Sequence, residues 1–209
     1  MRCCVCSGVG VVAFVAVDGR DYWRCPGCGA TFLDRGQLPG ADVERGQYEL
    51  HENDPDDAGY RRFLDRLASP LLERLGAGCE GLDYGCGPGP ALARMLEEAG
   101  HSVRLYDPFF QPDAGALERT YDFITCTETA EHFHTPRAEF ERLAAMLRPG
   151  GALAVMTCFQ TDDERFADWH YRRDPTHVVF YKEETFRRIG AMLGMRCEIP
   201  AKDVAILWK

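Results

Sequence analysis

The chain has 209 residues, which is enough for one full-size domain and a small appendage. Hydrophobic residues make up 45% of it and charged residues 27%, an ordinary balance for a globular protein with a packed core. The formal net charge of −9 disfavours a nucleic-acid partner, because binding phosphates requires a surplus of Lys and Arg on one face. The sequence has no charged leader before an apolar stretch and no apolar run of the ~20 residues that span a bilayer, so we expect a cytoplasmic protein without a membrane partner.

Cysteine is concentrated at the start of the chain, where five of the ten cysteines fall within the first 28 residues. They include two Cys-x-x-Cys pairs separated by 18 residues, a spacing typical of a four-thiolate zinc site. In such a pair both sulfurs can face one ion, so the predicted ligands are Cys3, Cys6, Cys25 and Cys28. Cys4 is an alternative to Cys3, although the resulting Cys-x-Cys spacing suits a tight turn less well.

Between the two pairs, residues 9–15 and 22–24 are predicted strands, and Asp18-Gly19 is the hairpin turn that joins them. Residues 1–38 therefore resemble a zinc ribbon. A segment of ~35 residues cannot build a sufficient core without a metal or another staple, which favours bound Zn²⁺. Because four cysteine ligands leave no coordination position for a catalytic water, we expect this zinc to be structural.

Residues 39–78 are predicted to be a linker followed by a helix. Residues 34–57 are rich in Gly, Pro, Asp and Glu, which indicates a connection rather than core. Apolar residues then recur at helical spacing from residue 56 or 57 to about residue 75, where Gly76-Ala77-Gly78 ends the run. Pro70 is expected to break or kink this helix.

From residue 79 to residue 209, strand-like runs alternate with helical patterns. Strands are expected at 81–84, 102–106, 123–126, 152–157, 195–199 and 204–208, and helices at 91–99, 136–147 and 183–193. This alternation predicts an α/β fold: a doubly wound, mostly parallel sheet with helices on both faces.

The first predicted strand of this region runs into a glycine-rich turn and then a helix. Glycine is needed there because the chain turns sharply and a ligand must pack against bare backbone. The next strand ends at Asp107, whose carboxylate can accept hydrogen bonds from both hydroxyls of a ribose. The loop has the spacing G-x-G-x-G, and Pro90 stands where the nicotinamide fingerprint has Gly or Ala. The predicted cofactor contacts of this region are Asp83, Gly85, Cys86, Gly87, Gly89 and Asp107.

Five ordered motifs make residues 48–209 similar to class I S-adenosylmethionine (SAM)-dependent methyltransferases. Residues 83–89 resemble their first motif and Asp107 their ribose-binding acid. Residues 121–126, 128–136 and 147–151 resemble their fourth strand, the segment after it and the turn before the fifth strand. The resemblance implies an enzyme with a Rossmann-like fold and SAM as its cofactor.

One departure from this family concerns the third strand. Only residues 109–120 separate the second strand from the fourth, which is too few for the usual helix, strand and helix. The third strand is therefore expected to be short or missing. Since that region helps to hold the adenine in the family, no adenine contacts are assigned.

Further cofactor contacts are expected on either side of the glycine loop. Thr127 and Glu128 follow the fourth strand and are expected to line the cofactor or acceptor pocket. Family members lay an N-terminal arm over the methionine part of the cofactor, and by this resemblance Tyr48, His51 and Asn53 are expected to contact it.

Histidines are the candidate catalytic residues, since a neutral imidazole can accept a proton from a methyl acceptor at neutral pH. His132 and His134 follow the fourth strand. His170 and His177 lie in a segment that resembles the W-x-Y-x-x-D-P-T-H loop of a subset of the family, where the loop covers the acceptor site. The predicted catalytic residues are His177, His132 and His170.

Two neighbouring expectations concern charge. Glu131 is expected to pair with Arg148 or to cap the next helix. A metal ion held by His132 and His134 is disfavoured, because the sequence forces no carboxylate partner beside them.

The favoured methyl acceptor is a small molecule, such as a sugar or another biosynthetic intermediate, methylated on oxygen or carbon. An RNA methyltransferase whose ribbon grips RNA is the alternative, although four arginines against three aspartates leave residues 1–40 at only +1. A SAM-binding regulatory module without turnover is a third interpretation, which the histidine-containing loop disfavours. An adenine or cytosine methylase would carry an Asn/Asp-Pro-Pro-aromatic motif after the fourth strand, where this chain has Thr127-Glu128-Thr129-Ala130.

Overall fold

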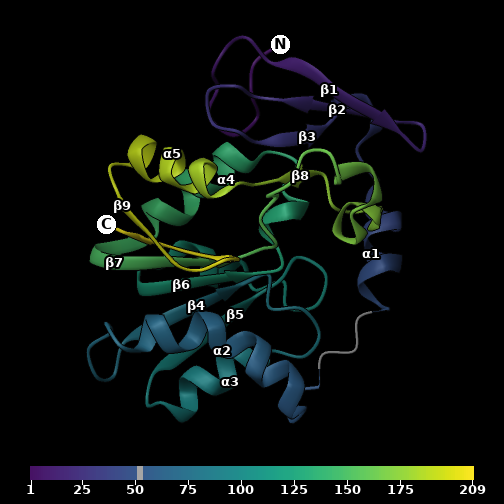
Figure 1. Cartoon of the computed structure of the whole chain (residues 1–209). Coiled ribbons are helices and arrows are strands. Elements are labelled where there is room, and N and C mark those ends of the chain that lie inside the picture. The colour runs from purple at the N-terminus through teal and green to yellow at the C-terminus, as the bar shows by residue number, and fades with distance from the viewer. Residues whose placement is uncertain (51–53) are drawn as a thin grey trace.

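A six-stranded sheet forms the centre of the computed structural model, which describes residues 1–50 and 54–209 (Figure 1). Its strand order is β5-β4-β6-β7-β10-β9. The four strands from β5 to β7 are parallel, whereas β10 pairs antiparallel with both β7 and β9. The strands are β4 (Glu80–Tyr84), β5 (Ser102–Tyr106), β6 (Tyr121–Thr127), β7 (Leu147–Met156), β9 (Arg196–Ala201) and β10 (Val204–Trp208). The predicted α/β architecture is confirmed, with a mixed sheet whose larger part is parallel.

Helices cover both faces of this sheet (Figure 1). On one face lie α2 (Ala58–Leu72) and α3 (Ala91–Glu98), and on the other lie α4 (Pro136–Ala145) and α5 (Glu183–Leu193). The Asp57 side chain caps α2 by accepting a hydrogen bond from the Tyr60 amide, and Pro70 sits in the last turn without ending the helix. Among the described helices, none has the length and apolar character needed to cross a membrane.

The connection from β5 to β6 has too few residues for the usual helix, strand and helix, and the structure agrees with the predicted loss of the third strand. Between Tyr106 and Tyr121 the chain forms only a 3-10 helix, Ala114–Glu118. The third strand of the usual methyltransferase sheet is therefore missing, and β5 is an edge strand.

A second, smaller sheet is built from the N-terminal segment and one strand from the rest of the chain. β1 (Val12–Val17) and β2 (Arg20–Arg24) form a hairpin whose turn residues Asp18 and Gly19 both have positive φ. β3 (Thr31–Leu33) pairs with β2 on one side and with β8 (Val179–Phe180) on the other. The predicted hairpin is therefore present, and through β3 its sheet extends to β8, which begins two residues after His177.

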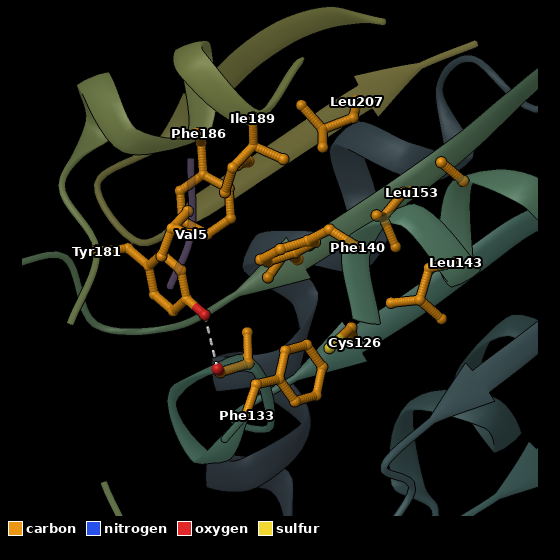
Figure 2. Close-up of a cluster of buried hydrophobic side chains, with 14 of the residues drawn as sticks. Val5, Cys126, Phe133, Phe140, Leu143, Leu153, Tyr181, Phe186, Ile189 and Leu207 are labelled. Carbon is orange, nitrogen blue, oxygen red and sulfur yellow. Dashed lines mark hydrogen bonds between the residues drawn. The ribbon is translucent and has the colours of Figure 1, made fainter. Parts of the chain in front are cut away.

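The buried core runs without a break from the N-terminal segment to the central sheet. Val5, Tyr181 and Phe186 belong to the same buried cluster as Phe140 on α4 and Leu153 on β7 (Figure 2). The Tyr181 hydroxyl donates a 2.8 Å hydrogen bond to the Ala130 carbonyl, the dashed line in Figure 2. This contact fixes the start of the segment that carries Glu131 and His132.

An additional helix, α1 (Ala41–Tyr48), lies in the segment that the sequence indicated to be only a connection. None of its residues is buried, so it carries no apolar stripe by which a helix could be predicted. Polar contacts hold it against the rest of the molecule: Gln47 donates to Asp174 at 3.2 Å, and Glu44 lies 3.0 Å from the ring nitrogen Nε2 of His134.

Candidate functional site

A cavity of about 690 Å³ opens where β4, β5 and β6 end at their carboxyl termini. In parallel sheets this edge is where ligands bind, because the loops that follow neighbouring strands converge there. All predicted cofactor residues that the structure describes line this cavity: Tyr48, Asp83, Gly85, Cys86, Gly87, Gly89, Asp107, Thr127 and Glu128. His51 and Asn53 lie outside the described residues.

The glycine loop after β4 has a backbone that side chains would disrupt. Gly85 has φ of 79° and Gly87 has φ of 63°, both in the left-handed region that favours glycine. A Cβ on Gly85 would lie 2.3 Å from side-chain atoms of Thr129. The amides of Gly85 and Cys86 both donate to the carbonyl of Tyr106, which ties the loop to the end of β5.

Asp107 is held in place by backbone amides. Its Oδ2 accepts a hydrogen bond of 3.1 Å from the Gly87 amide, and its Oδ1 accepts from the amides of Phe109 and Phe110 at 2.8 and 3.0 Å. The side chain is buried and lines the cavity beside the glycine loop. The carboxylate is therefore positioned before any ligand arrives.

Asp83 is a buried carboxyl group at the end of β4. The Thr125 hydroxyl donates to its Oδ1 at 2.8 Å. Burial raises the pKa of Asp83 to about 6, and the negative charge of Asp107 adds to the rise. A cation bound in the cavity would favour the ionised form of this group.

Two glutamates that line the cavity after β6 converge on one tyrosine. The Tyr171 hydroxyl contacts Oε2 of Glu128 at 3.2 Å, Oε1 of Glu131 at a shorter distance, and the Thr157 hydroxyl at 3.0 Å. Burial and the charge of Glu131 raise the pKa of the Glu128 carboxyl. Glu128 also has φ of 48°, a strained value for a non-glycine residue that is commonest at functional sites.

Two expectations about this region need correction or completion. Glu131 does not pair with Arg148, which instead binds Glu80 and Asp122 at the amino-terminal ends of β4 and β6. Tyr171 is not among the predicted site residues, yet it joins the loop to both glutamates. No sequence spacing indicates this contact, because 40 residues separate Tyr171 from Glu131.

Of the three candidate catalytic histidines, two line the cavity and one does not. His132 and His177 both line the cavity, and their ring centroids are 4.8 Å apart. Burial lowers the pKa of His177, so its imidazole is neutral at neutral pH. His170 is exposed and does not line the cavity. The ring of Tyr48 contacts His132 from α1, with 5.1 Å between ring centroids.

The four predicted zinc ligands form a compact group of sulfurs. Sγ of Cys3 lies 3.7 Å from Sγ of Cys28, and Sγ of Cys6 lies 3.6 Å from Sγ of Cys25. All four are free thiols whose ligand atoms lie within 4.8 Å of one another, and Cys4 is not among them. Backbone amides point at the sulfurs, since the Val5 and Cys6 amides lie 3.4 and 3.5 Å from Sγ of Cys3.

Comparison with known proteins agrees with this geometry. A family model described as a methyltransferase domain matches residues 57–198, more than half of the chain. The chain belongs to this methyltransferase family. It carries a SAM-dependent methyltransferase domain, as the motifs predicted.

Relatives of this methyltransferase include two ubiquinone biosynthesis O-methyltransferases. The protein from Erwinia tasmaniensis is 29% identical over 148 residues, which are 68% of this chain and 59% of the relative. The protein from Pectobacterium carotovorum is 31% identical over 131 residues, 56% of this chain and 55% of the relative. The methyltransferase thus matches little more than half the length of these relatives.

Two solved structures share the fold of this methyltransferase. The 1,6-didemethyltoxoflavin-N1-methyltransferase of Burkholderia thailandensis, solved with its substrate and S-adenosylhomocysteine (SAH), has a TM-score of 0.57 at 16% identity, and the match covers 94% of this chain and 98% of that one. A second methyltransferase structure, from Bacillus halodurans, has a TM-score of 0.52 at 21% identity, and the match covers 65% of this chain and 67% of that one. At these identities the likeness concerns the fold.

Proposed function

We propose that this protein transfers the methyl group of SAM to a small-molecule acceptor, on an oxygen or carbon atom. The observation that carries the proposal is the cavity itself, which is lined both by the glycine loop with Asp107 and by the pair His132–His177. Methyl transfer from a sulfonium needs little more than alignment of the acceptor, exclusion of water and removal of a proton from the acceptor.

The glycine loop and Asp107 fit SAM. Gly85 and Gly87 leave bare backbone facing the cavity, and Asp107 has an ordered carboxylate able to accept hydrogen bonds from a ribose diol. Asp83 suits a positively charged ligand, because a nearby cation lowers the cost of its buried charge. SAM, when bound, supplies the methyl group and the sulfur leaving group.

The part of the cavity lined by Glu131, His132 and His177, here called the acceptor end, fits the methyl acceptor. His132 and His177 are the proposed catalytic residues there, where they assist loss of the acceptor's proton. His170, although it remains a candidate from its motif, does not reach the cavity in this conformation. The relatives' name, ubiquinone biosynthesis O-methyltransferase, supports a hydroxyl as the acceptor group.

The N-terminal thiols are proposed to bind structural Zn²⁺ as a zinc ribbon. With Zn–S bonds of about 2.3 Å, tetrahedral geometry places sulfurs ~3.8 Å apart. The distances here, each between one sulfur from either Cys-x-x-Cys pair, are 3.7 Å for Cys3–Cys28 and 3.6 Å for Cys6–Cys25. The amides directed at Sγ of Cys3 stabilise a thiolate, as a zinc ligand requires.

The acceptor class can be tested by following a radiolabelled methyl group from SAM in a cell extract. We expect label in the small-molecule fraction, with loss of at least tenfold in Asp107→Ala and no change in the control Asp113→Ala, which alters an exposed aspartate on the same connection. Label that appears in RNA and is removed by ribonuclease would favour the alternative, an RNA methyltransferase. Absence of any transfer despite SAM binding would favour the regulatory module.

A further inference from the structure

Three side chains converge at the acceptor end of the cavity, whereas removal of a proton from the acceptor would require only one base. Glu131, His132 and His177 each present one potential ligand atom, and these atoms lie within 4.8 Å of one another. Glu131 and His132 are on the 3-10 helix Ala130–His132 that follows β6, while His177 precedes β8. We propose that these three side chains bind a divalent metal ion of the first transition series.

Both histidines have the outer hydrogen bond that metal-binding histidines commonly have. Nδ1 of His132 lies 3.0 Å from the carbonyl of Thr176, and Nδ1 of His177 lies 2.7 Å from the carbonyl of Tyr171. A carbonyl only accepts, so each neutral ring carries its proton on Nδ1 and keeps a lone pair on Nε2. The nearest charged group to Nε2 of His177 is the Asp174 carboxylate, whose Oδ2 lies 3.9 Å away. Metal-binding histidines are held in this way, with the outer nitrogen donating to a carbonyl or carboxylate and the other nitrogen facing the ion.

Glu131 supplies a second observation, which does not depend on the geometry of the histidines. Its side chain is completely buried, and Oε1 accepts a hydrogen bond from the Tyr171 hydroxyl. Its other oxygen, Oε2, is buried without a hydrogen-bond partner among the described residues. An unpaired carboxylate oxygen inside a protein is costly, and a bound cation would offset that cost.

The donor set indicates the kind of ion. Two imidazole nitrogens and one carboxylate oxygen suit ions such as Mn²⁺, Co²⁺ or Zn²⁺, whose ligand bonds near 2.1 Å place neighbouring donors ~3.0 to 3.4 Å apart. The three ligand atoms here lie within 4.8 Å of one another, so we expect them to move closer together when the ion binds. Three protein ligands leave coordination positions open, which is typical of catalytic rather than structural sites. The N-terminal site differs in its donors, which are all sulfur, and in having four protein ligands, which leave no coordination position open.

The inference rests on the proposed function and names how the acceptor would be activated. A cation that binds the acceptor oxygen lowers the pKa of its hydroxyl, so the proton leaves to water. The oxygen would then attack the methyl carbon and form the new carbon–oxygen bond with its own lone pair. The carbon–sulfur bond breaks at the same time, and its electron pair stays on sulfur to give SAH and a methyl ether. In this scheme His132 and His177 are ligands and not bases.

Manganese is the appropriate probe, because Mn²⁺ prefers nitrogen and oxygen donors to a site of four thiolates. Titration of the purified full chain with Mn²⁺, followed by the electron paramagnetic resonance signal of the free ion, should show one strong site per chain. We expect His132→Gln and His177→Gln each to weaken that site at least tenfold. The matched control is His101→Gln, whose histidine contacts the Cys79 amide and Phe123 away from the cavity and should leave Mn²⁺ binding unchanged.

Calorimetric SAH binding separates failure of this inference from failure of the proposed function. Variants that still bind SAH are folded, so a loss of Mn²⁺ binding in them supports the metal site. If wild-type protein binds SAH but takes up no Mn²⁺, or binds it equally well in all three variants, the metal site is wrong and the proposed function stands. If wild-type protein does not bind SAH, the proposed function fails, whatever Mn²⁺ does.

Discussion

At the scale of single residues, the charge of Asp83 links cofactor binding to pH. Burial raises the pKa of this carboxyl to about 6, so the ligand-free protein holds a proton there below that pH. SAM carries a sulfonium charge that favours the ionised carboxylate, and its binding must therefore release this proton in acid.

We expect SAM affinity to rise as pH increases from 5 to 6 and to level off above pH 6, by at most about tenfold per pH unit in the rising part. Calorimetry across pH 5 to 7 would measure this. SAH, which lacks the sulfonium charge, should show a weaker rise, and Asp83→Asn should remove it. An equal pH dependence for SAM in wild-type protein and in Asp83→Asn would contradict this role of Asp83.

A second residue-scale test distinguishes Cys3 from Cys4 as a zinc ligand. Sγ of Cys3 lies among the other three sulfurs and receives amide contacts, whereas Cys4 is outside the group. We expect Cys3→Ser to lose bound zinc and Cys4→Ser to keep one zinc per chain, as measured by elemental analysis after dialysis. Zinc loss in Cys4→Ser alone would reverse the assignment.

At the scale of elements, the small sheet links the thiol cluster to the acceptor end of the cavity. β3 lies between β2 and β8, and the Leu33 amide donates to the carbonyl of Val178 at 2.9 Å. Val178 directly follows His177. Order in the N-terminal segment should therefore be transmitted to the segment that carries this histidine.

Removal of zinc with a chelator is expected to speed amide hydrogen exchange in β3 and in residues 178–181, because both depend on the same ladder. Exchange in β4 and β6 should not change, since these strands lie in the central sheet. Hydrogen-exchange mass spectrometry would resolve these peptides. Unaltered exchange at residues 178–181 after complete zinc loss would show that the small sheet holds together without metal.

The sequence predicts elements well where their signal is local. The glycine loop is predictable because Gly85 and Gly87 must adopt positive φ within a few residues of a strand end. The missing third strand follows from the number of residues between β5 and β6. In contrast, α1 has no buried face, and β3 and β8 have only three and two residues, too few to show a period.

At the scale of the whole molecule, the site could be predicted only in part. Asp107 and the glycine loop belong to motifs whose residues are close together in the sequence. The part of the cavity that they line can therefore be predicted from the sequence. The acceptor end depends on contacts between distant segments: Glu131 contacts Tyr171, and His132 contacts His177, only in the folded chain. Charge pairing with Arg148 was a reasonable expectation from sequence, yet the fold places that arginine at the opposite end of the sheet.

The central claim is that the glycine loop and Asp107 bind SAM, and titration calorimetry with SAH measures this most directly. Wild-type protein is expected to bind one SAH per chain, Asp113→Ala to bind it equally, and Asp107→Ala to bind it at least tenfold more weakly while keeping its circular dichroism spectrum. Failure of wild-type protein to bind SAH or SAM, or undiminished binding by Asp107→Ala, would contradict the account.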